Sequence, residues 1–402
     1  MRMVTLVLML MLAFLLVQTA GAEAGKTGGR PMVLANYYTW YTTPWGAGGE
    51  FGFWTRPKPN KLLGRPADPN TVLYPPAIRE ICSAAYPLIG PYDSMNKDVV
   101  RWHIRLAKAA GIDGFMVDWW GPATWQTPSG WTHDVFVKAV LPVAEEENFK
   151  IVLFDECPQF VDDFDTVKQW TVKYLKQFKD SPVWLHIDGQ PAWCIYQLWK
   201  GKLTAEQGRE LIEHVEKQVG PVYWIVDKMR GRITDAGFEL FVPDDWLAIP
   251  QIDCIMGYAM FSTYRLYKYE ELAPVYKAFA QSVHGAGKKL MLPVHPGHDN
   301  RRKSEEPWVM PRDGGETYKG FWKAASQAGA EFIEITSWNE WMETTVIEPA
   351  MTWPDPYMYL KLTAEMQGRK FKAPPLPPLE SIDPLMQDYL KIKQAAEDCS
   401  DE

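Results

Sequence analysis

The 402-residue sequence contains few cysteines, and beyond its first residues it has no long apolar run. The five cysteines show no CxxC spacing, which argues against a zinc site and against a dense disulfide framework. At most two disulfide bridges can form, and the sequence does not assign them. No segment reaches the roughly 20 apolar residues that span a bilayer, so we expect no stable membrane insertion. The cysteines are Cys82, Cys157, Cys194, Cys254 and Cys399.

Positive charge is also in short supply. The chain has 42 lysine and arginine residues against 50 aspartate and glutamate residues, and its formal net charge is −8. Because attraction to phosphate dominates the affinity of nucleic-acid-binding proteins, this balance argues against nucleic acid as a partner. Neutral or cationic glycans fit the average charge more easily than strongly anionic ones, although a local basic pocket could override the average.

The first residues have the pattern of an export signal. Met1-Arg2-Met3 precedes an apolar stretch, residues 4–17, and Ala20-Gly21-Ala22 offers small residues for cleavage. We predict that residues 1–22 are a signal peptide and that the mature chain begins near Glu23. The sequence therefore predicts a secreted or periplasmic protein.

The body of the sequence repeats short apolar runs, each separated from the next by room for a helix. Such runs predict strands, and their alternation with helices predicts βα units and a parallel sheet. Eight units favour a closed (β/α)8 TIM barrel, an α/β fold, over residues 31–368. The expected strands are residues 32–38, 113–119, 150–154, 183–187, 222–226, 254–258, 289–294 and 332–336.

Helices are expected between these strands. Asn96 or Asp98 can cap a helix in which Val100 and Ile104 recur at helical spacing, and Gly111 then ends it. Further helices are expected at residues 167–178, 205–218, 272–284 and 317–327.

Two segments depart from the βα pattern. The sequence from Gly46 to Tyr92 is rich in proline and glycine, and a loop this long is usually functional. We expect this insertion after the first strand to wall part of a cleft. After Gly368, the run Ala373-Pro-Pro-Leu-Pro-Pro378 predicts a stiff linker, and a polar tail with a helix near residues 384–396 follows it. We treat residues 369–402 as this linker and tail.

The end of the last expected strand carries the most informative motif. The strand runs into a polar turn with Glu340 and Glu343, and Trp338 and Trp341 flank the first carboxylate. Glycosidic hydrolysis usually needs one carboxylic acid to protonate the leaving oxygen and a second carboxylate, and aromatic faces support sugar rings. We interpret Glu340 and Glu343 as a catalytic pair, with a raised pKa at Glu343. The alternative is that both acids are surface charges and the tryptophans belong to the core.

Acidic and aromatic residues also gather at the other expected strand ends, where a barrel of this type carries its catalytic side chains. Strand alternation means that at most one of Trp119 and Trp120 supports a sugar. His298 and Arg301 could equally brace a loop. The candidate substrate-binding residues are Tyr37, Tyr38, Trp40, Asp118, Trp119, Trp120, Glu156, Tyr196, Tyr258, His298, Asp299, Arg301, Trp338, Asn339, Trp341 and Glu348. We expect no cofactor and no metal.

Taken in order, these motifs resemble glycoside hydrolase family 99 and its neighbours, the family 71/99-like and WbsX-like exported proteins. The last motif is the most specific. The resemblance rests on Tyr37-Tyr38-x-Trp40-Tyr41, Pro91-Tyr92-Asp93-Ser94, Asp113-Gly-Phe-Met-Val-Asp118-Trp-Trp-Gly-Pro122, Asp188-Gly-Gln-Pro191, Pro296-Gly-His-Asp299 and Trp338-Asn-Glu340-Trp-x-Glu343.

The resemblance implies a (β/α)8 barrel that cleaves internal α-mannosidic bonds with retention of configuration. By position, Glu340 would match the base that takes the proton from the sugar's 2-hydroxyl, whose oxygen then attacks the anomeric carbon to give a 1,2-anhydro sugar. Glu343 would match the general acid. Glu156 would match a glutamate that contacts the sugar.

The chain departs from the family pattern around the two acids. Met342, Thr344 and Val346 stand where that pattern has histidine, glycine and glutamine, and Glu156 lies in Phe-Asp-Glu-Cys-Pro rather than Phe-His-Ile-Glu-Pro-Tyr. Both acids are kept while the residues around them differ. The hydrolytic interpretation therefore holds, and the identity of the sugar stays open.

Two other functions are compatible with the sequence. A non-catalytic glycan-binding protein could keep the barrel and its aromatic cleft, although binding alone does not require the acid pair. A metal-dependent hydrolase could use His295, His298 and Asp299, although a further histidine ligand is not evident. The expected partner is an oligosaccharide or polysaccharide, and we expect a monomer.

Overall fold

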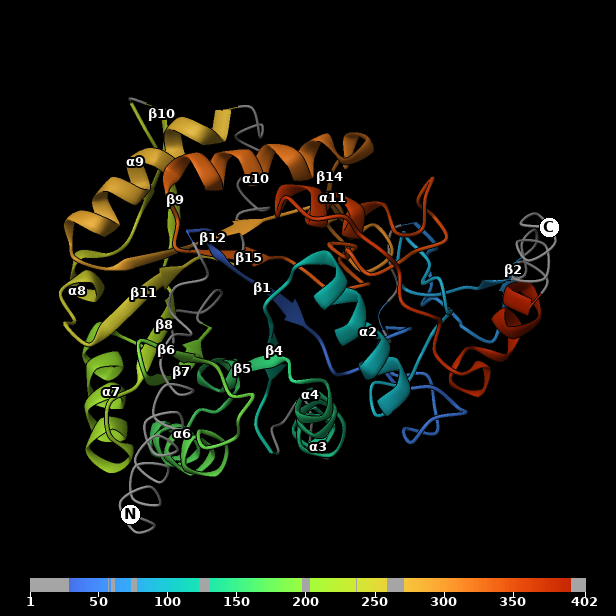
Figure 1. Cartoon of the computed structure of the whole chain (residues 1–402), viewed down its shortest axis with the longest axis horizontal. Coiled ribbons are helices and arrows are strands. Elements are labelled where there is room, and N and C mark those ends of the chain that lie inside the picture. Colours follow the sequence, from blue (N-terminus) through green and yellow to red (C-terminus); the bar gives the residue numbers. More distant parts are fainter. Residues whose placement is uncertain are drawn as a thin grey trace, which may run out of the picture.

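Eight parallel strands close into a barrel in this computed structural model, which describes residues 29–56, 58, 62–73, 78–122, 130–196, 203–235, 237–258 and 271–391 (Figure 1). Neighbouring strands follow the order β5-β4-β1-β15-β12-β11-β8-β7, and β5 pairs with β7 to complete the ring. The predicted (β/α)8 barrel is confirmed, whereas the predicted signal peptide lies outside the described residues. The barrel strands are β1 (Met32–Tyr37), β4 (Gly114–Trp119), β5 (Lys150–Asp155), β7 (Gln190–Ile195), β8 (Tyr223–Asp227), β11 (Ile252–Met256), β12 (Lys289–Val294) and β15 (Phe332–Ile335).

The fourth strand is the one that the sequence misplaced. It was predicted at residues 183–187, whereas the barrel strand is β7. The short strand β6 (His186–Ile187) pairs antiparallel with β7 across a tight turn, in which Asp188 and Gly189 have φ values of 51° and 80°. Positive φ at both central residues, with the pair Asp-Gly, is typical of a two-residue hairpin. Residues 183–187 therefore lead into a hairpin, and β7, the second strand of that hairpin, is the barrel strand.

Helices follow the strands and form the outer layer of the barrel (Figure 1). The side-chain oxygen of Asn96 caps α2 (Lys97–Ala110) by accepting hydrogen bonds from the backbone N–H groups of Asp98 and Val99, and Gly111 ends the helix with a φ of 85°. Both predicted helix ends are confirmed. The other helices are α3 (Trp131–Val135), α4 (Leu141–Glu147), α5 (Cys157–Phe160), α6 (Phe164–Phe178), α7 (Ala205–Val219), α8 (Asp244–Leu247), α9 (Leu272–Gly285), α10 (Glu316–Ala328) and α11 (Met358–Met366).

Short helical turns and antiparallel strand pairs lie in the connections between the barrel strands and helices. A π-helical turn at Phe136–Val140 joins α3 to α4, and 3-10 turns lie at Asp313–Gly315 and Leu379–Ser381. The insertion between β1 and α2 contains a small antiparallel pair, and a second pair follows β12 at the same end of the barrel as the predicted site. The antiparallel pairs are β2 (Val72–Leu73) with β3 (Ile78–Arg79), β9 (Arg230–Thr234) with β10 (Gly237–Phe241), and β13 (His298–Asp299) with β14 (Val309–Met310).

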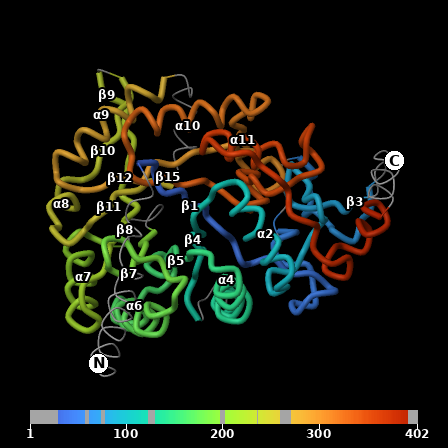
Figure 2. The backbone as a smooth tube through the Cα atoms, in the orientation of Figure 1, coloured from blue at the N-terminus to red at the C-terminus, as the bar shows by residue number. Residues whose placement is uncertain are grey.

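The segment after α11 runs back to the insertion that follows β1 (Figure 2). Asp383 is fully buried, and its carboxylate accepts a hydrogen bond from Arg79 Nε at 2.8 Å. The backbone N–H of Asp383 donates to the carbonyl of Ile89 at 3.2 Å, and Met386 is buried beside it. A helix covers residues 384–391, where the description ends. The described part of the predicted tail therefore packs against the insertion and holds it in place.

No helix within the described ranges is long and apolar enough to cross a membrane. Cys82, Cys157, Cys194 and Cys254 are buried and carry free thiols, and Cys399 lies outside the described residues. Packing between strands and helices therefore holds the described part of the barrel together.

Candidate active site

Glu340 and Glu343 come from a single turn after β15. Glu340 is 2 % exposed, and the side chain of Glu343 is 17 % exposed. The backbone N–H of Glu343 donates to Glu340 Oε1 at 3.2 Å, and the backbone N–H of Glu340 donates to Ser337 Oγ at 2.8 Å. The turn therefore holds the two carboxyl groups as neighbours at the carboxyl-terminal end of the barrel, where barrel enzymes carry their chemistry.

Lys303, in the loop between β13 and β14, sets the charge of this pair. Its Nζ donates to Glu343 Oε1 at 2.6 Å. Burial opposes the ionisation of Glu343, but the positive charges of Lys303 and His298 outweigh it and lower the pKa of Glu343 below its usual value. Burial raises the pKa of Glu340 to about 7, with Lys303 opposing the rise and Glu343 adding to it. The sequence predicts a raised pKa at Glu343, and Lys303 reverses this order, so that Glu340 has the raised pKa instead.

A second pair of carboxyl groups faces the first. Asp118 lies near the end of β4, Glu156 directly follows β5, and both are buried. Burial, with repulsion from Glu156, raises the pKa of Asp118 well above its usual value, and burial raises the pKa of Glu156 to about 8. The charge of Glu340 contributes to both shifts. Two adjacent carboxyl groups of this kind share a proton near neutral pH, so this pair can both donate and accept hydrogen bonds.

An aromatic cavity of about 450 Å³ adjoins these carboxyl groups. Trp40 and Phe53 stack with their ring centroids 5.0 Å apart, and Trp120 meets Trp40 edge-on at 5.2 Å. Phe53 belongs to the long insertion, so the insertion forms one wall of the cavity. The lining residues are Trp40, Phe51, Gly52, Phe53, Thr55, Arg56, Trp120, Lys303 and Met342.

Three tyrosines lie beside the carboxyl groups. The hydroxyl groups of Tyr38 and Tyr258 are 2.5 Å apart, and the ring of Tyr196 meets that of Tyr258 edge-on at 5.3 Å. Burial raises the pKa of all three hydroxyls far above the usual value, and the charges of Glu340 and Glu343 add to the shift at Tyr258. These hydroxyls therefore stay neutral and can donate hydrogen bonds to a sugar.

The two adjacent tryptophans at the end of β4 face opposite sides, as strand alternation predicts. Trp119 Nε1 lies 3.2 Å from His133 Nδ1, and its ring packs edge-on against Tyr174 of α6 at 5.0 Å. Trp120 lines the aromatic cavity. The structure therefore corrects the assignment of Trp119 as a substrate-binding residue, because its ring belongs to the strand–helix interface.

Four further candidates form a buried network behind the catalytic turn. Tyr37 Oη lies 3.1 Å from His103 Nδ1, and His103 Nε2 lies 3.1 Å from Glu348 Oε1. Trp341 Nε1 donates to Glu348 Oε2 at 3.0 Å, and the ring of Trp338 packs on His103 at 5.6 Å. All four residues are at most 1 % exposed and contact α2 or one another. The structure corrects their assignment as substrate contacts, since they hold the turn against the barrel.

Three polar candidates position loops. Asn339 Oδ1 accepts a hydrogen bond from the backbone N–H of Tyr38 at 2.7 Å, and Asn339 Nδ2 donates to the carbonyl of Tyr38 at 2.9 Å. Arg301 is 53 % exposed and pairs with Asp299 at 2.5 Å. The backbone N–H of Asp299 donates to the carbonyl of Glu343 at 2.8 Å. Asn339, Asp299 and Arg301 thus brace the site rather than line its cavity.

The metal-dependent alternative gains no support from the histidines. Across the described ranges, no group of three or more His, Cys, Asp or Glu side chains is arranged to hold a metal ion. His295 meets Phe321 of α10 edge-on at 5.1 Å, and burial lowers its pKa to about 3. His298 instead stacks on Trp308 at 4.0 Å and acts on Glu343 through its charge. The two imidazoles therefore have different neighbours.

Sequence reasoning missed two cations of this site, Lys303 and Arg56. Of the basic run Arg301-Arg302-Lys303, the sequence predicts only Arg301 at the site. Arg56 lies in the insertion, which is predicted to wall the cleft but supplies none of the predicted site residues. A signal was present in both cases, because each basic residue lies in a segment that follows a barrel strand at its carboxyl-terminal end.

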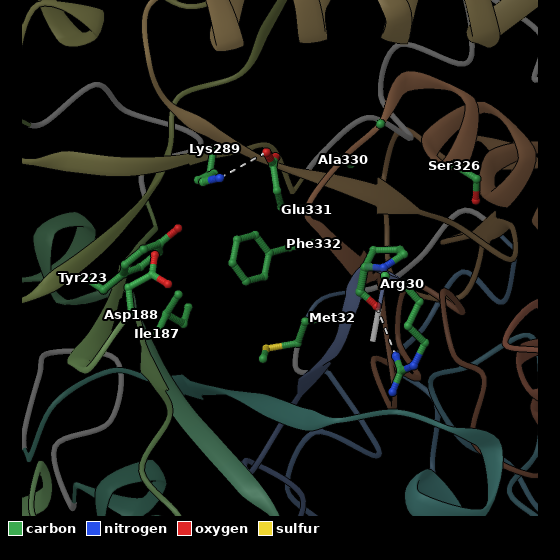
Figure 3. Close-up of a pocket in the computed structure, with 13 residues that line it drawn as sticks. Arg30, Met32, Ile187, Asp188, Tyr223, Lys289, Ser326, Ala330, Glu331 and Phe332 are labelled. Atoms are coloured by element: carbon green, nitrogen blue, oxygen red, sulfur yellow. Dashed lines mark hydrogen bonds and ion pairs between the residues drawn. The ribbon is translucent and has the colours of Figure 1, made fainter. Parts of the chain in front are cut away.

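A second cavity, of about 460 Å³, opens at the opposite, amino-terminal end of the barrel (Figure 3). Met32, Tyr223 and Phe332, which are the first residues of β1, β8 and β15, line it together with Lys289 and Glu331. Lys289 Nζ and Glu331 Oε1 are 3.6 Å apart. Barrel enzymes carry their active sites at the carboxyl-terminal end of the barrel, so we do not assign this cavity to the reaction.

Comparisons with known proteins agree with this geometry. The model of glycosyl hydrolase family 99 matches residues 30–368. The glycoprotein endo-alpha-1,2-mannosidase of Rattus norvegicus is 25 % identical over 346 residues, which cover 79 % of this chain and 68 % of the relative. The corresponding protein of Xenopus laevis is 22 % identical over 366 residues, which cover 84 % and 76 %.

A solved structure shows the same fold. The family 99 endo-alpha-mannosidase from Bacteroides thetaiotaomicron superposes with a TM-score of 0.63 at 21 % identity, over 84 % of this chain and 96 % of that one. The family match over most of the sequence identifies a glycoside hydrolase, and the shared barrel fold agrees with it. The chain belongs to glycosyl hydrolase family 99.

Proposed function

We propose that this protein cleaves internal α-mannosidic bonds in an oligosaccharide or polysaccharide, with retention through a 1,2-anhydro sugar. The observation that carries the proposal is the single turn after β15, which holds the carboxyl groups of Glu340 and Glu343 as neighbours. The curated relatives are named as endo-alpha-1,2-mannosidases, which supports an α-mannoside as substrate.

The two glutamates divide the work as the family pattern implies. Glu340 takes the proton of the sugar's 2-hydroxyl, and the oxygen attacks the anomeric carbon as the glycosidic bond breaks. Glu343 gives its proton to the leaving oxygen. In the second step Glu343 removes a proton from water, the water oxygen opens the three-membered ring, and Glu340 returns the proton to the 2-oxygen.

The other groups of the site have supporting roles. The shared proton of Asp118 and Glu156 lets this pair donate to one sugar hydroxyl and accept from another. Trp120 and Trp40 offer faces to the apolar side of a sugar ring. The ion pair of Lys303 with Glu343 must open before Glu343 carries the proton, so substrate entry has to separate the two groups.

The first test is the product of the purified protein acting on α-mannan oligosaccharides of defined linkage. We expect internal cleavage, and proton NMR of the first-formed product should show the α-anomer. A first product in the β-configuration would overturn the retaining mechanism. Oligosaccharide binding without any product after long incubation would favour a glycan-binding protein instead.

We also propose that the chain is exported, because residues 1–22 have the pattern of a signal peptide. N-terminal sequencing of protein recovered outside the cytoplasm should find a new end near Glu23. Recovery of the uncleaved chain from the cytoplasm alone would contradict this proposal.

A further inference from the structure

The aromatic cavity beside the catalytic pair is basic, which the average charge of the chain does not explain. Among the described residues, its lining contains two cations, Arg56 and Lys303, and no carboxylate. The chain as a whole has a net charge of −8. A cavity with this lining attracts a negative group rather than a neutral one, because field lines concentrate where one sign of charge lines a low-dielectric wall.

Arg56 is half-buried in the cavity wall, and its guanidinium group makes no hydrogen bond and no ion pair with another described residue. Its charge acts on Glu343 only at longer range, where it contributes to the lowered pKa of that carboxyl group. By contrast, Arg65 and Arg79 of the same insertion pair with Glu80 and Asp383 at 2.7 and 2.8 Å. Removing a cation from water is costly without a partner, so Arg56 is arranged to receive one.

Lys303 connects the aromatic cavity to the predicted catalytic pair. Its amine lies 2.6 Å from Glu343 and also lines the cavity beside Arg56. Burial opposes the charged form of Lys303, but Glu343 and Glu340 outweigh it and raise the pKa of Lys303, while the charge of Arg56 acts against this rise. The two cations are therefore close enough to act on a single anion.

The aromatic walls indicate what carries that anion. Trp40, Phe53 and Trp120 form adjoining faces of the cavity, with ring centroids 5.0 to 6.0 Å apart. Such faces accept the apolar side of a sugar ring, while a guanidinium group recognises sulfate, phosphate or carboxylate through paired hydrogen bonds. A free inorganic anion would leave the aromatic surface unused.

We propose that this cavity is a subsite for a sugar residue that carries an anionic substituent, held by Arg56 and Lys303. The proposal rests on the glycosidase function proposed above and narrows its substrate to a charged glycan. An anion on Lys303 would compete with Glu343 for the amine. Binding of the charged sugar would thus open the ion pair that keeps the proton away from the general acid.

The test compares charged and neutral versions of one substrate with the full chain. Kinetics are measured on α-mannan oligosaccharides bearing sulfate, phosphate or carboxylate groups, and on the same oligosaccharides after removal or reduction of these groups. We expect kcat/KM to be at least about tenfold higher for one charged series, as for a charge-assisted hydrogen bond, and to fall with added salt. The three series identify which anion is preferred.

Two variants of Arg56 assign the preference to this residue. Arg56→Met should reduce the ratio of charged to neutral kcat/KM by about tenfold, and Arg56→Lys should retain part of it, since the charge stays while the paired hydrogen bonds are lost. Arg209→Met, on α7 of the helical layer, is the matched control and should leave the ratio unchanged. Circular dichroism confirms that each variant is folded.

The outcomes separate this proposal from the proposed function. Equal cleavage of charged and neutral oligosaccharides by the wild-type chain would overturn the anionic subsite while the hydrolase function stands. A charged preference that survives in Arg56→Met would also overturn it. If titration calorimetry shows binding of mannose 6-sulfate or mannose 6-phosphate that Arg56→Met abolishes, but no oligosaccharide is cleaved, the subsite stands and the hydrolase function fails.

Discussion

The two ends of the barrel each contain a cavity with aromatic and charged residues nearby, but the acidic side chains at the two ends differ in how far they are exposed to water. At the amino-terminal end, Glu331 pairs with His284 at 3.1 Å and with Lys289 at 3.6 Å, and these side chains are about a third or more exposed. At the carboxyl-terminal end, Glu340 and Glu156 are buried, and burial raises the pKa of Glu340 to about 7 and that of Glu156 to about 8.

The comparison shows that a cavity alone does not mark a site. Charges that face water and one another contribute little free energy. Buried carboxyl groups without enough counter-charge titrate near neutral pH, which is what acid–base chemistry requires. If this is correct, catalytic activity should depend on the buried carboxyl groups and not on the charged residues around the amino-terminal cavity.

The largest effect should come from the catalytic pair. Glu340→Gln and Glu343→Gln each keep the shape of the side chain but remove the proton transfer, so we expect kcat to fall about 10²- to 10⁴-fold. Turnover of a mannoside with an activated leaving group should recover more in Glu343→Gln than in Glu340→Gln, because such a leaving group does not need the acid. Near-normal turnover in either variant would defeat the assignment.

A smaller loss should follow from breaking the second carboxyl pair. Glu156→Gln removes one acceptor of the shared proton and leaves Asp118 buried beside an amide. We expect kcat/KM to fall about 10- to 100-fold, the effect of losing one hydrogen bond to a charged group at a sugar. Steady-state kinetics measure the fall in kcat/KM. Thermal unfolding checks that the variant is folded. An unchanged kcat/KM would show that this pair only holds the strand ends together.

The pH dependence of kcat/KM tests the role of Lys303. The catalytic pair holds a single proton above the lowered pKa of Glu343 and below the pKa of Glu340 near 7, so kcat/KM should fall as the pH rises through about 7. Lys303→Met removes the cation that lowers the pKa of both glutamates, and the alkaline limb should move to higher pH. Because burial raises the pKa of Glu156 to about 8, the same profile in Glu156→Gln is the control. A limb that stays in place in Lys303→Met would contradict this role.

The fold could be predicted because strand and helix signals are local. The cap at Asn96 and the end at Gly111 depend on residues a few positions apart, and both were found. The fourth strand was misplaced because residues 183–187 are as apolar as β7, and only the Asp188-Gly189 turn reveals which run returns into the barrel.

The site was harder to predict because burial and direction depend on tertiary packing. Trp338, Trp341 and Glu348 stand next to the catalytic glutamates in the sequence, yet they point into the network around His103. Conversely, Lys303 is distant in sequence but forms an ion pair with Glu343. Proximity in sequence predicts that Glu340 and Glu343 share one turn, whereas the lysine that sets the charge of this pair comes from another loop.

The smallest effect should come from the amino-terminal cavity. Glu331→Gln removes the ion pairs with Lys289 and His284 but keeps an acceptor for the backbone N–H of Leu290, which now donates to Glu331 Oε2 at 3.0 Å. We expect a loss of unfolding free energy below about 1 kcal/mol, as for exposed ion pairs, measured by urea denaturation. We also expect kcat/KM to stay within about twofold of the wild-type value, since the cavity lies at the end of the barrel that carries no chemistry. A tenfold loss of activity in a folded variant would mean that the two ends are coupled through the barrel interior, because β15 is the element that links Glu331 to the catalytic turn.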